Sequence, residues 1–398
     1  MSDPLVDIII VNWNSRQDTL ACLEAADGQL REVPGSVITV VDNGSTDGSI
    51  GAIAARYPKV RLLPLGENRG FTGGLAAALA RSRATSVIFL NNDAIPDRGW
   101  LAALVGALER SPQDVISVGG KIVDLSGQLI DFIGGALTFD GHAFQSGFRY
   151  PLASRTGPSA GDEILFACGG NMISRREPFM RLGGFDNDYF AYLEDVDFGW
   201  RSWLSGFRVV YEPAAVVRHA SSATSRRLGD FERGVLFERN ALQTALKNFE
   251  NLSEAGGSLF FSFLSRLHHY ASTRNPRAGE LTRPPFASAP QPHVSSWTSR
   301  IRNRIFGRPP LATIDDPLTV MQFRAFHWVV SNTQRIAEKR QEVQHRRVRS
   351  DREIFEKFPL HLVPTYPGDE GMMAGALFQM LLPELPAVEK TLSEIMKT

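Results

Sequence analysis

Short clusters of polar residues in this sequence have the types and spacing needed to bind or transform a ligand. Asn91-Asn92-Asp93 directly follows an apolar run. A carboxylate there could hold a divalent cation, because Mg²⁺ and Mn²⁺ prefer oxygen ligands and often share them with substrate phosphates. A simple turn is the alternative, since Asn and Asp favour turns.

Two further clusters could bind a nucleotide. Asp42-Asn43-Gly44-Ser45 also follows an apolar run, and Asp42 could accept a hydrogen bond from a nucleobase or belong to a helix cap. In Glu67–Gly74, glycines allow close approach of the backbone, and a helix start attracts phosphate. This stretch matches neither the dinucleotide fingerprint nor the P-loop, and a structural loop explains it equally well.

The remaining candidates are acidic residues and one histidine. Glu194, Asp195 and Asp197 lie within four residues and repel one another, which suits either a solvated helix start or a partly buried acidic site. Aromatic neighbours favour the buried site, where a carboxylate could act as a general base. His219 follows an apolar run, and such a lone histidine is more often structural than a ligand.

The segments around these clusters predict the elements that position them. β-branched apolar runs predict strands at 6–11, 37–41, 60–64 and 86–90, and the spacing between them predicts helices at 15–30, 49–57, 73–83 and 99–110. This alternation predicts a mainly parallel sheet with helices on both faces. The polar clusters should then meet at the edge formed by the carboxyl ends of the strands, where ligands bind in such sheets.

The second half of the chain differs in composition. Asp140-Gly141 predicts a hairpin turn, and residues 176–250 predict helices with one strand at 207–211. Residues 262–310 carry eight Arg, seven Pro and one acidic residue, which predicts a linker. Residues 317–358 predict basic helices, and 371–396 one or two short packing helices. We therefore expect two parts, 1–250 and 251–398.

Charge and cysteine content limit the function classes. The formal net charge is zero, which argues against a nucleic-acid partner, but residues 1–250 hold 24 basic and 29 acidic residues whereas 251–398 hold 19 and 14. Cys22 and Cys168 cannot form a disulfide framework. No basic leader precedes an apolar stretch and no run could span a bilayer, so we expect a cytoplasmic protein, soluble or bound at the inner face of the membrane.

Taken together and in this order, the motifs resemble those of family 2 glycosyltransferases, which have the GT-A fold, over residues 5–245. The rhamnosyltransferase-like subgroup of bacterial surface-polysaccharide enzymes is the most similar. The resemblance rests on the following motifs: Val11-Asn12-Trp13-Asn14, Val41–Asp47, Asn68-Arg69-Gly70-Phe71, Asn91-Asn92-Asp93, Glu194-Asp195-Val196-Asp197 and His219. It implies a Rossmann-like α/β domain followed by a mostly helical C-terminal extension.

The resemblance also implies roles for these residues. Asp195 is expected to be the base, with Glu194 or Asp197 orienting the site or replacing it in that role. Asp93 and His219 are expected to bind Mg²⁺ or Mn²⁺. Asp42 is expected to read the donor base and Asn91 to bond the ribose, within a donor site made of Val11, Asn12, Trp13, Asp42, Asn68, Arg69, Gly70, Asn91 and Asn92.

The implied reaction is an inverting, metal-assisted transfer from a nucleotide sugar to a hydroxyl of a glycan or lipid-linked acceptor. dTDP-rhamnose is the first candidate donor, followed by a UDP-hexose or UDP-galactofuranose. Asn91 replaces the first acid of the family's Asp-any-Asp motif, which makes the metal site less anionic, and no processive-synthase signature follows His219. A non-catalytic nucleotide- or glycan-binding subunit and a sugar nucleotidyltransferase are the alternatives. The basic C-terminal region could contact anionic lipid or the acceptor.

Overall fold

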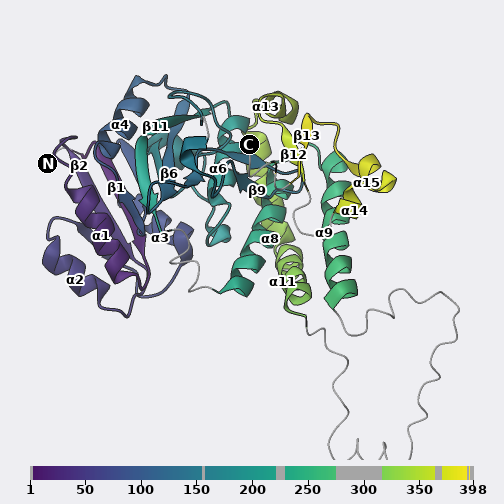
Figure 1. The fold of residues 1–398 in the computed structure, drawn as a ribbon, viewed down its shortest axis with the longest axis horizontal. Helices are drawn as coiled ribbons and strands as arrows, with labels where there is room; N and C mark the ends of the chain where they lie inside the picture. The colour runs from purple at the N-terminus through teal and green to yellow at the C-terminus, as the bar shows by residue number, and fades with distance from the viewer. Residues whose placement is uncertain are drawn as a thin grey trace, which may run out of the picture.

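The centre of the protein is a nine-stranded sheet with helices on both faces (Figure 1). The computed structural model describes residues 3–154, 157–220, 229–274, 316–363, 370–391 and 394. The strands follow the order β3-β2-β1-β4-β10-β6-β11-β5, and β7 pairs with β6. Their bounds are β1 (Val6–Asn12), β2 (Ser36–Asp42), β3 (Arg61–Pro64), β4 (Ser86–Asn91), β5 (Ala94–Pro96), β6 (Val115–Asp124), β7 (Ile130–Phe132), β10 (Asn171–Arg175) and β11 (Arg208–His219).

The expected α/β architecture is confirmed. Strands β1 to β4 pair in parallel, and β10 runs antiparallel to both β4 and β6, so that β6 and its parallel neighbour β11 point the same way as β4. Six strands therefore share one direction. The register places Asn12 beside Asp42 and Val11 beside Asn91, so the polar clusters do meet at the carboxyl edge.

The helices of this part cover the two faces of the sheet. They are α1 (Arg16–Asp27), α2 (Ser49–Arg56), α3 (Gly70–Leu79), α4 (Trp100–Arg110), α5 (Arg176–Arg181) and α6 (Glu194–Leu204), with short 3₁₀ turns η1 (Leu152–Ser154) and η2 (Asn187–Tyr189). Alternate residues of β1 point into different cores, because Ile8 and Ile10 join one buried cluster and Ile9 the other. A strand buried on both faces is continuously apolar, which is why the sequence revealed it.

Three expectations for the middle of the chain have different outcomes. The hairpin at Asp140-Gly141 is confirmed, since β8 (Gly135–Leu137) pairs antiparallel with β9 (Ala143–Gln145). The strand expected at 207–211 is too short, because β11 continues to His219 along β6 and β5 after an irregularity between Glu212 and Val216. The linker expected from residue 262 is wrong for its first part, which is helical.

That helix, α9 (Leu252–Arg274), continues until shortly before Pro276, the first proline of the stretch. It buries Leu259, Phe263 and Arg266 at helical spacing. Residues 275–310 of the expected linker lie outside the described residues. The two ends of this gap lie near each other, because Arg274 Nη1 is 4.0 Å from Asp316 Oδ1.

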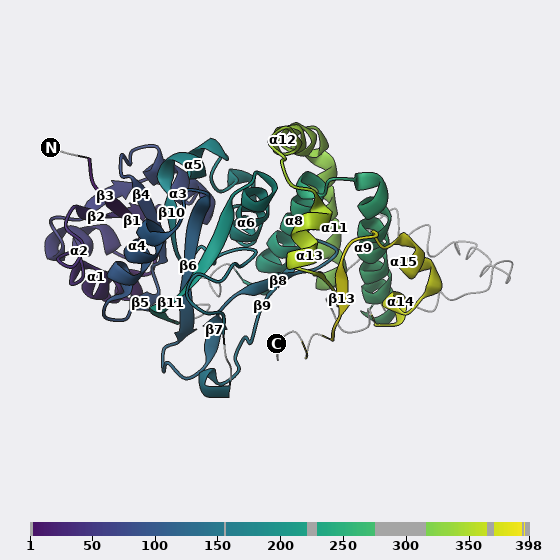
Figure 2. The same ribbon diagram turned by 90° about the horizontal axis from the view of Figure 1, so that it is seen from above.

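The C-terminal region is mostly helical, as expected, and lies beyond α6, at the opposite end of the protein from α1 and α2 (Figure 2). Helix α8 lies in contact with α6, α9, α11 and α12. The elements are α8 (Asp230–Asn248), α9, α11 (Pro317–Ser331), α12 (Thr333–His345), α13 (Asp351–Lys357), α14 (Glu370–Met373), α15 (Ala376–Leu381) and the two-stranded sheet of β12 (Leu360–Leu362) and β13 (Ala387–Glu389). None of the helices within the described ranges is long and apolar enough to cross a bilayer.

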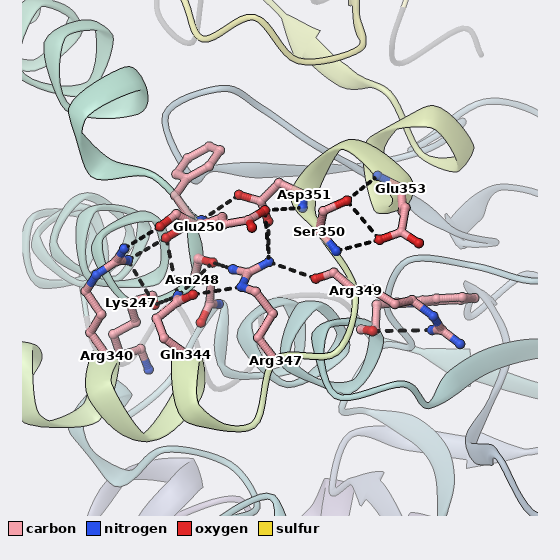
Figure 3. A network of polar contacts seen from close by, with 12 residues as sticks. Lys247, Asn248, Glu250, Arg340, Gln344, Arg347, Arg349, Ser350, Asp351 and Glu353 are labelled. Carbon is pink, nitrogen blue, oxygen red and sulfur yellow. Dashed lines mark hydrogen bonds and ion pairs between the residues drawn. The ribbon is translucent and has the colours of Figure 1, made fainter.

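Two side chains of α12, Arg340 and Gln344, bind the carboxyl end of α8 (Figure 3). Arg340 donates to the carbonyls of Leu246 (3.1 Å) and Glu250 (2.7 Å), and Gln344 donates to that of Lys247 (3.0 Å). The last carbonyls of a helix lack partners within it and carry partial negative charge, so this contact stabilises α8.

Further basic residues of this region also contact the protein itself. Arg347 donates to the carbonyl of Asn248 and pairs with Asp351 at 3.0 Å. Arg335 pairs with an acid of the first part, Asp188. Lys339 pairs with Asp188 too, and also with Asp186. The charge difference between the two halves of the chain is therefore in part internal complementarity, and the boundary at residue 250 is crossed by many polar contacts.

Candidate active site

The ends of β1 and β2 form a closed polar cluster. Asn12 donates to Asp42 Oδ1 at 2.9 Å and accepts from Thr19 at 2.8 Å, while the Ser45 backbone N–H donates to Asp42 Oδ2 at 2.9 Å. Asp42 is fully buried, so both of its oxygens fix the strand ends. A carboxylate has about four acceptor positions, and these two bonds occupy two of them.

The loop before α3 is joined to this cluster. Asn43 donates from its side chain to the Gly70 carbonyl at 2.8 Å, and the Arg69 backbone N–H donates to Asn43 Oδ1 at 3.3 Å. Asn68 Oδ1 accepts from the Gly70 N–H at 2.9 Å. Val11 and Trp13 are partly exposed beside the buried Asn12. The expected donor-site residues from β1, β2 and this loop are thus brought together.

Gly70 lies against the segment before α6. Its φ is +74°, and a Cβ there would lie 2.4 Å from the carbonyl oxygen of Phe190. Glycine is therefore required by both conformation and space. The Thr72 backbone N–H also donates to Phe190 O at 3.2 Å, so the candidate donor loop and the segment leading to the candidate catalytic carboxylates are in direct contact.

Asp93 and His219 meet where β5 pairs with β11. His219 Nε2 lies 3.0 Å from Asp93 Oδ1 and 3.3 Å from Asn91 Nδ2. Asn92 is buried and donates to Thr19 at 3.1 Å, so it faces the protein interior. The structure therefore brings His219 to Asn91 and Asp93, although it lies 128 and 126 positions further along the chain.

Asp131 of β7 completes this cluster and was not predicted. Its Oδ2 lies 2.9 Å from His219 Nδ1. Burial lowers the pKa of His219, but hydrogen bonds with Asp131 and Asp93 outweigh it and raise that pKa to about 10. The only sequence signal for Asp131 is a charged residue inside the apolar run Ile130–Ile133, and nothing there identifies its partner.

The fit of this cluster to a divalent cation follows from its donor atoms. A carboxylate on Nδ1 fixes the orientation of the imidazole, so that Nε2, once deprotonated, could coordinate a metal together with Asp93, an arrangement common around metal-binding histidines. No group of three or more His, Cys, Asp or Glu side chains in the described part of the chain is arranged to hold a metal ion. Two protein ligands plus diphosphate oxygens would suit Mg²⁺ or Mn²⁺.

The carboxylates at the start of α6 lie in three different environments. Asp195 is partly exposed, and its oxygens accept from the backbone N–H groups of Gly169 (2.9 Å) and Val196 (2.8 Å). Burial raises the pKa of Asp195 despite these bonds. Glu194 is 5% exposed, and burial followed by the charge of Asp195 raises its pKa well above the usual range.

Asp197, in contrast, is part of the protein interior. It accepts from Arg201 at 2.8 Å and from Asn248 at 3.0 Å, and Lys247 Nζ lies 3.1 Å away. Burial alone would raise the pKa of Asp197, but Arg201 and Lys247 lower it. Asp195 is therefore the most accessible of the three carboxylates.

Gly169 and Gly170 join the two halves of the candidate site. The Gly169 N–H donates to Asp195, and the Asn91 N–H donates to the Gly170 carbonyl at 3.1 Å. A Cβ at Gly170 would lie 2.5 Å from Asn91 Nδ2, so a larger residue there would displace the Asn91 side chain. Sequence reasoning missed both residues, although the Gly-Gly pair was a signal for close backbone contact.

Comparisons with known proteins show the family of this chain. The model of the family described as "Glycosyl transferase family 2" matches residues 7–183. N-acetylglucosaminyl-diphospho-decaprenol L-rhamnosyltransferase of Mycobacterium tuberculosis is 33% identical over 217 residues, which cover 49% of this chain and 70% of that protein. The O-antigen biosynthesis protein RfbC of Myxococcus xanthus is 30% identical over 230 residues, which cover 55% of this chain and 17% of that protein.

Solved structures are similar at lower identity. The mannosyltransferase PcManGT from Pyrobaculum calidifontis, in complex with GDP-Man and Mn²⁺, is 18% identical with a TM-score of 0.45, covering 84% of this chain and 88% of that one. GalNAc-T7 with UDP, GalNAc and Mn²⁺ is 14% identical with a TM-score of 0.49, covering 66% of this chain and 51% of that one.

Proposed function

Because this chain belongs to glycosyl transferase family 2, we propose that it transfers a sugar from a nucleotide-diphosphate donor to a hydroxyl of a lipid-linked glycan acceptor, in bacterial surface-polysaccharide synthesis. The similarity to a rhamnosyltransferase whose name specifies a diphospho-decaprenol acceptor supports dTDP-rhamnose as the first candidate donor. The observation that carries the proposal is the position of Asp195, which is accessible and joined through Gly169-Gly170 to the Asn91 cluster.

The donor site is formed by the carboxyl edge of the sheet. The nucleobase lies beside the buried Asp42, which accepts its bond at a position that the contacts with Asn12 and Ser45 leave open, and the main chain around Val11, Asn12 and Trp13 lines the same pocket. Asn91 bonds the ribose, and the loop of Asn68, Arg69 and Gly70 faces the donor. The contacts of Asn43 with both the strand ends and this loop support a single, connected site.

Asp195 serves as the general base. Its two backbone hydrogen bonds fix the carboxylate, and its raised pKa makes it a better proton acceptor than an ordinary aspartate. It removes the proton from the acceptor hydroxyl, whose oxygen attacks the anomeric carbon on the face opposite the leaving diphosphate. The bond to the diphosphate breaks as the new bond forms, so configuration inverts in one displacement.

Asp93 and His219 would hold the divalent cation, with Asp131 orienting the imidazole. When bound, such a cation supplies Lewis-acid stabilisation of the charge that develops on the leaving diphosphate. The proton on His219 Nε2 must leave before that atom can coordinate, so cation binding should release a proton.

Replacement of Asp195 by Asn tests the base. We expect the Asp195→Asn variant to fold and bind donor normally, while nucleoside diphosphate release coupled to transfer falls on the order of 10²- to 10⁴-fold. The Glu194→Gln variant is the comparison. Near-normal transfer by Asp195→Asn together with a loss in Glu194→Gln would assign the base to Glu194 instead.

Removal of metal tests the cation. We expect EDTA to abolish transfer and added Mn²⁺ to restore it, and calorimetry should show weaker Mn²⁺ binding by His219→Ala than by the unaltered protein. Full activity in EDTA would refute the roles of Asp93 and His219.

A peripheral membrane contact is part of the proposal, and exposed apolar side chains support it better than the basic helices do. Phe260 and Leu264 of α9 and Leu377 and Met380 of α15 are exposed, whereas many Arg and Lys side chains of α12 contact the protein. We expect the Phe260→Gln, Leu264→Gln double variant to lose flotation with anionic liposomes. Unchanged flotation would exclude this surface.

A further inference from the structure

The segment that leads into α6 has an unusual backbone conformation. Phe190, Tyr192 and Leu193 all have positive φ, at 64°, 71° and 64°. Bulky residues rarely adopt this region, and each such residue costs on the order of 1–3 kcal/mol unless its surroundings fix it. The segment ends directly before Glu194 and Asp195, so its conformation sets where these carboxylates lie.

One buried side chain of α8 holds this segment. Asn240 is fully buried, and its Nδ2 lies 3.1 Å from the carbonyl oxygen of Tyr189, 2.9 Å from that of Ala191 and 2.8 Å from that of Tyr192. Its Oδ1 accepts from Gln243 at 2.9 Å, which fixes the amide with its nitrogen toward the segment. The neighbouring Arg239 adds a bond to the carbonyl of Asp188 at 2.9 Å.

We propose that Asn240 is a positioning residue for catalysis, which holds residues 189–193 in the strained conformation that aims Asp195 at the acceptor hydroxyl. This inference rests on the proposed role of Asp195 as base. Carbonyl oxygens that point toward one another need a hydrogen-bond donor between them. Each hydrogen bond makes a net contribution of about 0.5–1.5 kcal/mol, so several hydrogen bonds are required to balance the strain.

The same segment also contacts the candidate donor loop. The Phe190 carbonyl accepts from Thr72 at the start of α3, and Gly70 packs against it. A shift of residues 189–193 would therefore move the base and change its distance from the donor at the same time. Displacements near 1 Å can reduce turnover on the order of 100-fold.

The experiment compares two substitutions on the same face of α8. Asn240→Asp keeps the size of the side chain but replaces the donor by an acceptor that faces three carbonyl oxygens. Thr244→Val, one turn further along, removes the contact of Thr244 with the Tyr189 hydroxyl (2.5 Å) but leaves the carbonyls of Ala191 and Tyr192 bonded. Asn240→Ser, which retains one donor, serves as a milder variant if Asn240→Asp does not fold.

For Asn240→Asp we expect kcat to fall on the order of 10- to 100-fold. Donor binding by calorimetry should be unchanged, and hydrogen exchange should be faster at the amides of residues 190–196. Thr244→Val should lower Tm but keep the kcat per folded molecule. The kcat of Asn240→Ser should lie between those of Asn240→Asp and Thr244→Val. Normal kcat and normal exchange in a folded Asn240 variant would overturn the proposal.

Failure of the proposed function gives a different pattern. If Asp195 is not the base, Asp195→Asn remains active, and faster exchange in Asn240→Asp would then occur without a loss of kcat. That result would also overturn a positioning role in catalysis. The faster hydrogen exchange would still show that Asn240 holds the segment in place.

Discussion

His142 should make the stability of this protein depend on pH in the alkaline range. It lies beyond the turn of the β8–β9 hairpin, with Nδ1 3.1 Å from Asp140 Oδ1 and Nε2 3.5 Å from Glu238 Oε1. Arg266 pairs with the same two acids, at 2.8 Å and 3.4 Å. Burial alone would lower the pKa of His142, but Asp140 and Glu238 raise it to about 9.

The magnitude follows from the difference between the folded and unfolded states. The pKa of His142 is raised from 6.5 to about 9 on folding, and each unit corresponds to about 1.4 kcal/mol, so protonated His142 contributes about 3 kcal/mol. Because the folded pKa is the higher one, this contribution is complete below about pH 6.5 and is lost as pH rises through about 9.

Urea unfolding of the unaltered protein and of His142→Gln at a series of pH values measures this effect. We expect the difference in unfolding free energy to shrink by about 3 kcal/mol between pH ~6 and pH ~9.5. His361→Gln is the control, because burial, followed by the charge of Lys390, lowers the pKa of His361 to about 4. The difference in unfolding free energy between His361→Gln and the unaltered protein should therefore stay constant above pH ~7. A constant difference for His142→Gln over the same range would refute the reasoning.

Two further substitutions test contacts that join distant parts of the fold. Gly70→Ala places a Cβ 2.4 Å from Phe190 O at a φ of +74°, so we expect it to lower the unfolding free energy by at least about 2 kcal/mol and to weaken donor binding in calorimetry. If Gly70→Ala and the unaltered protein had the same donor affinity and the same unfolding free energy, the loop would be able to move away from Phe190. Arg347→Met leaves the buried Asp351 without its ion pair and should cost about 3–5 kcal/mol in urea unfolding, whereas Arg346→Met, at an exposed neighbouring position, should stay within about 0.5 kcal/mol. Similar losses in both variants would contradict the importance of the contacts that Arg347 makes with Asp351 and with the end of α8.

The part of the site that was predictable lies on strands that the sequence marks clearly. Buried parallel strands are short continuous apolar runs, so Asn12, Asp42 and Asn91 could be placed at strand ends and expected at one edge. The short helices and the hairpin follow from equally local signals. Each of these features depends on neighbouring residues in the chain.

The part that was missed depends on pairings between distant residues. Asp131 lies 88 positions from His219, and Asn240 lies 48 positions from Tyr192, so no local pattern shows that either pair is in contact. Insertion of β10 between β4 and β6 places Gly170 beside Asn91, and this antiparallel strand is not recognisable from alternation alone. The charge count predicts that the second half of the chain is basic. It does not predict that Asp186 and Asp188 form ion pairs with Lys339 of that half.

The proximity of Arg274 and Asp316 has a consequence for how this architecture can vary. Two helix ends that already meet can be joined by a connection of almost any length, since each doubling of a loop changes its closure free energy by only about 0.6 kcal/mol. Helix α9 also packs directly against α11. A change in the length of the chain between Arg274 and Asp316 should therefore leave the contact of α9 with α11, and the candidate site at the carboxyl edge of the sheet, in place.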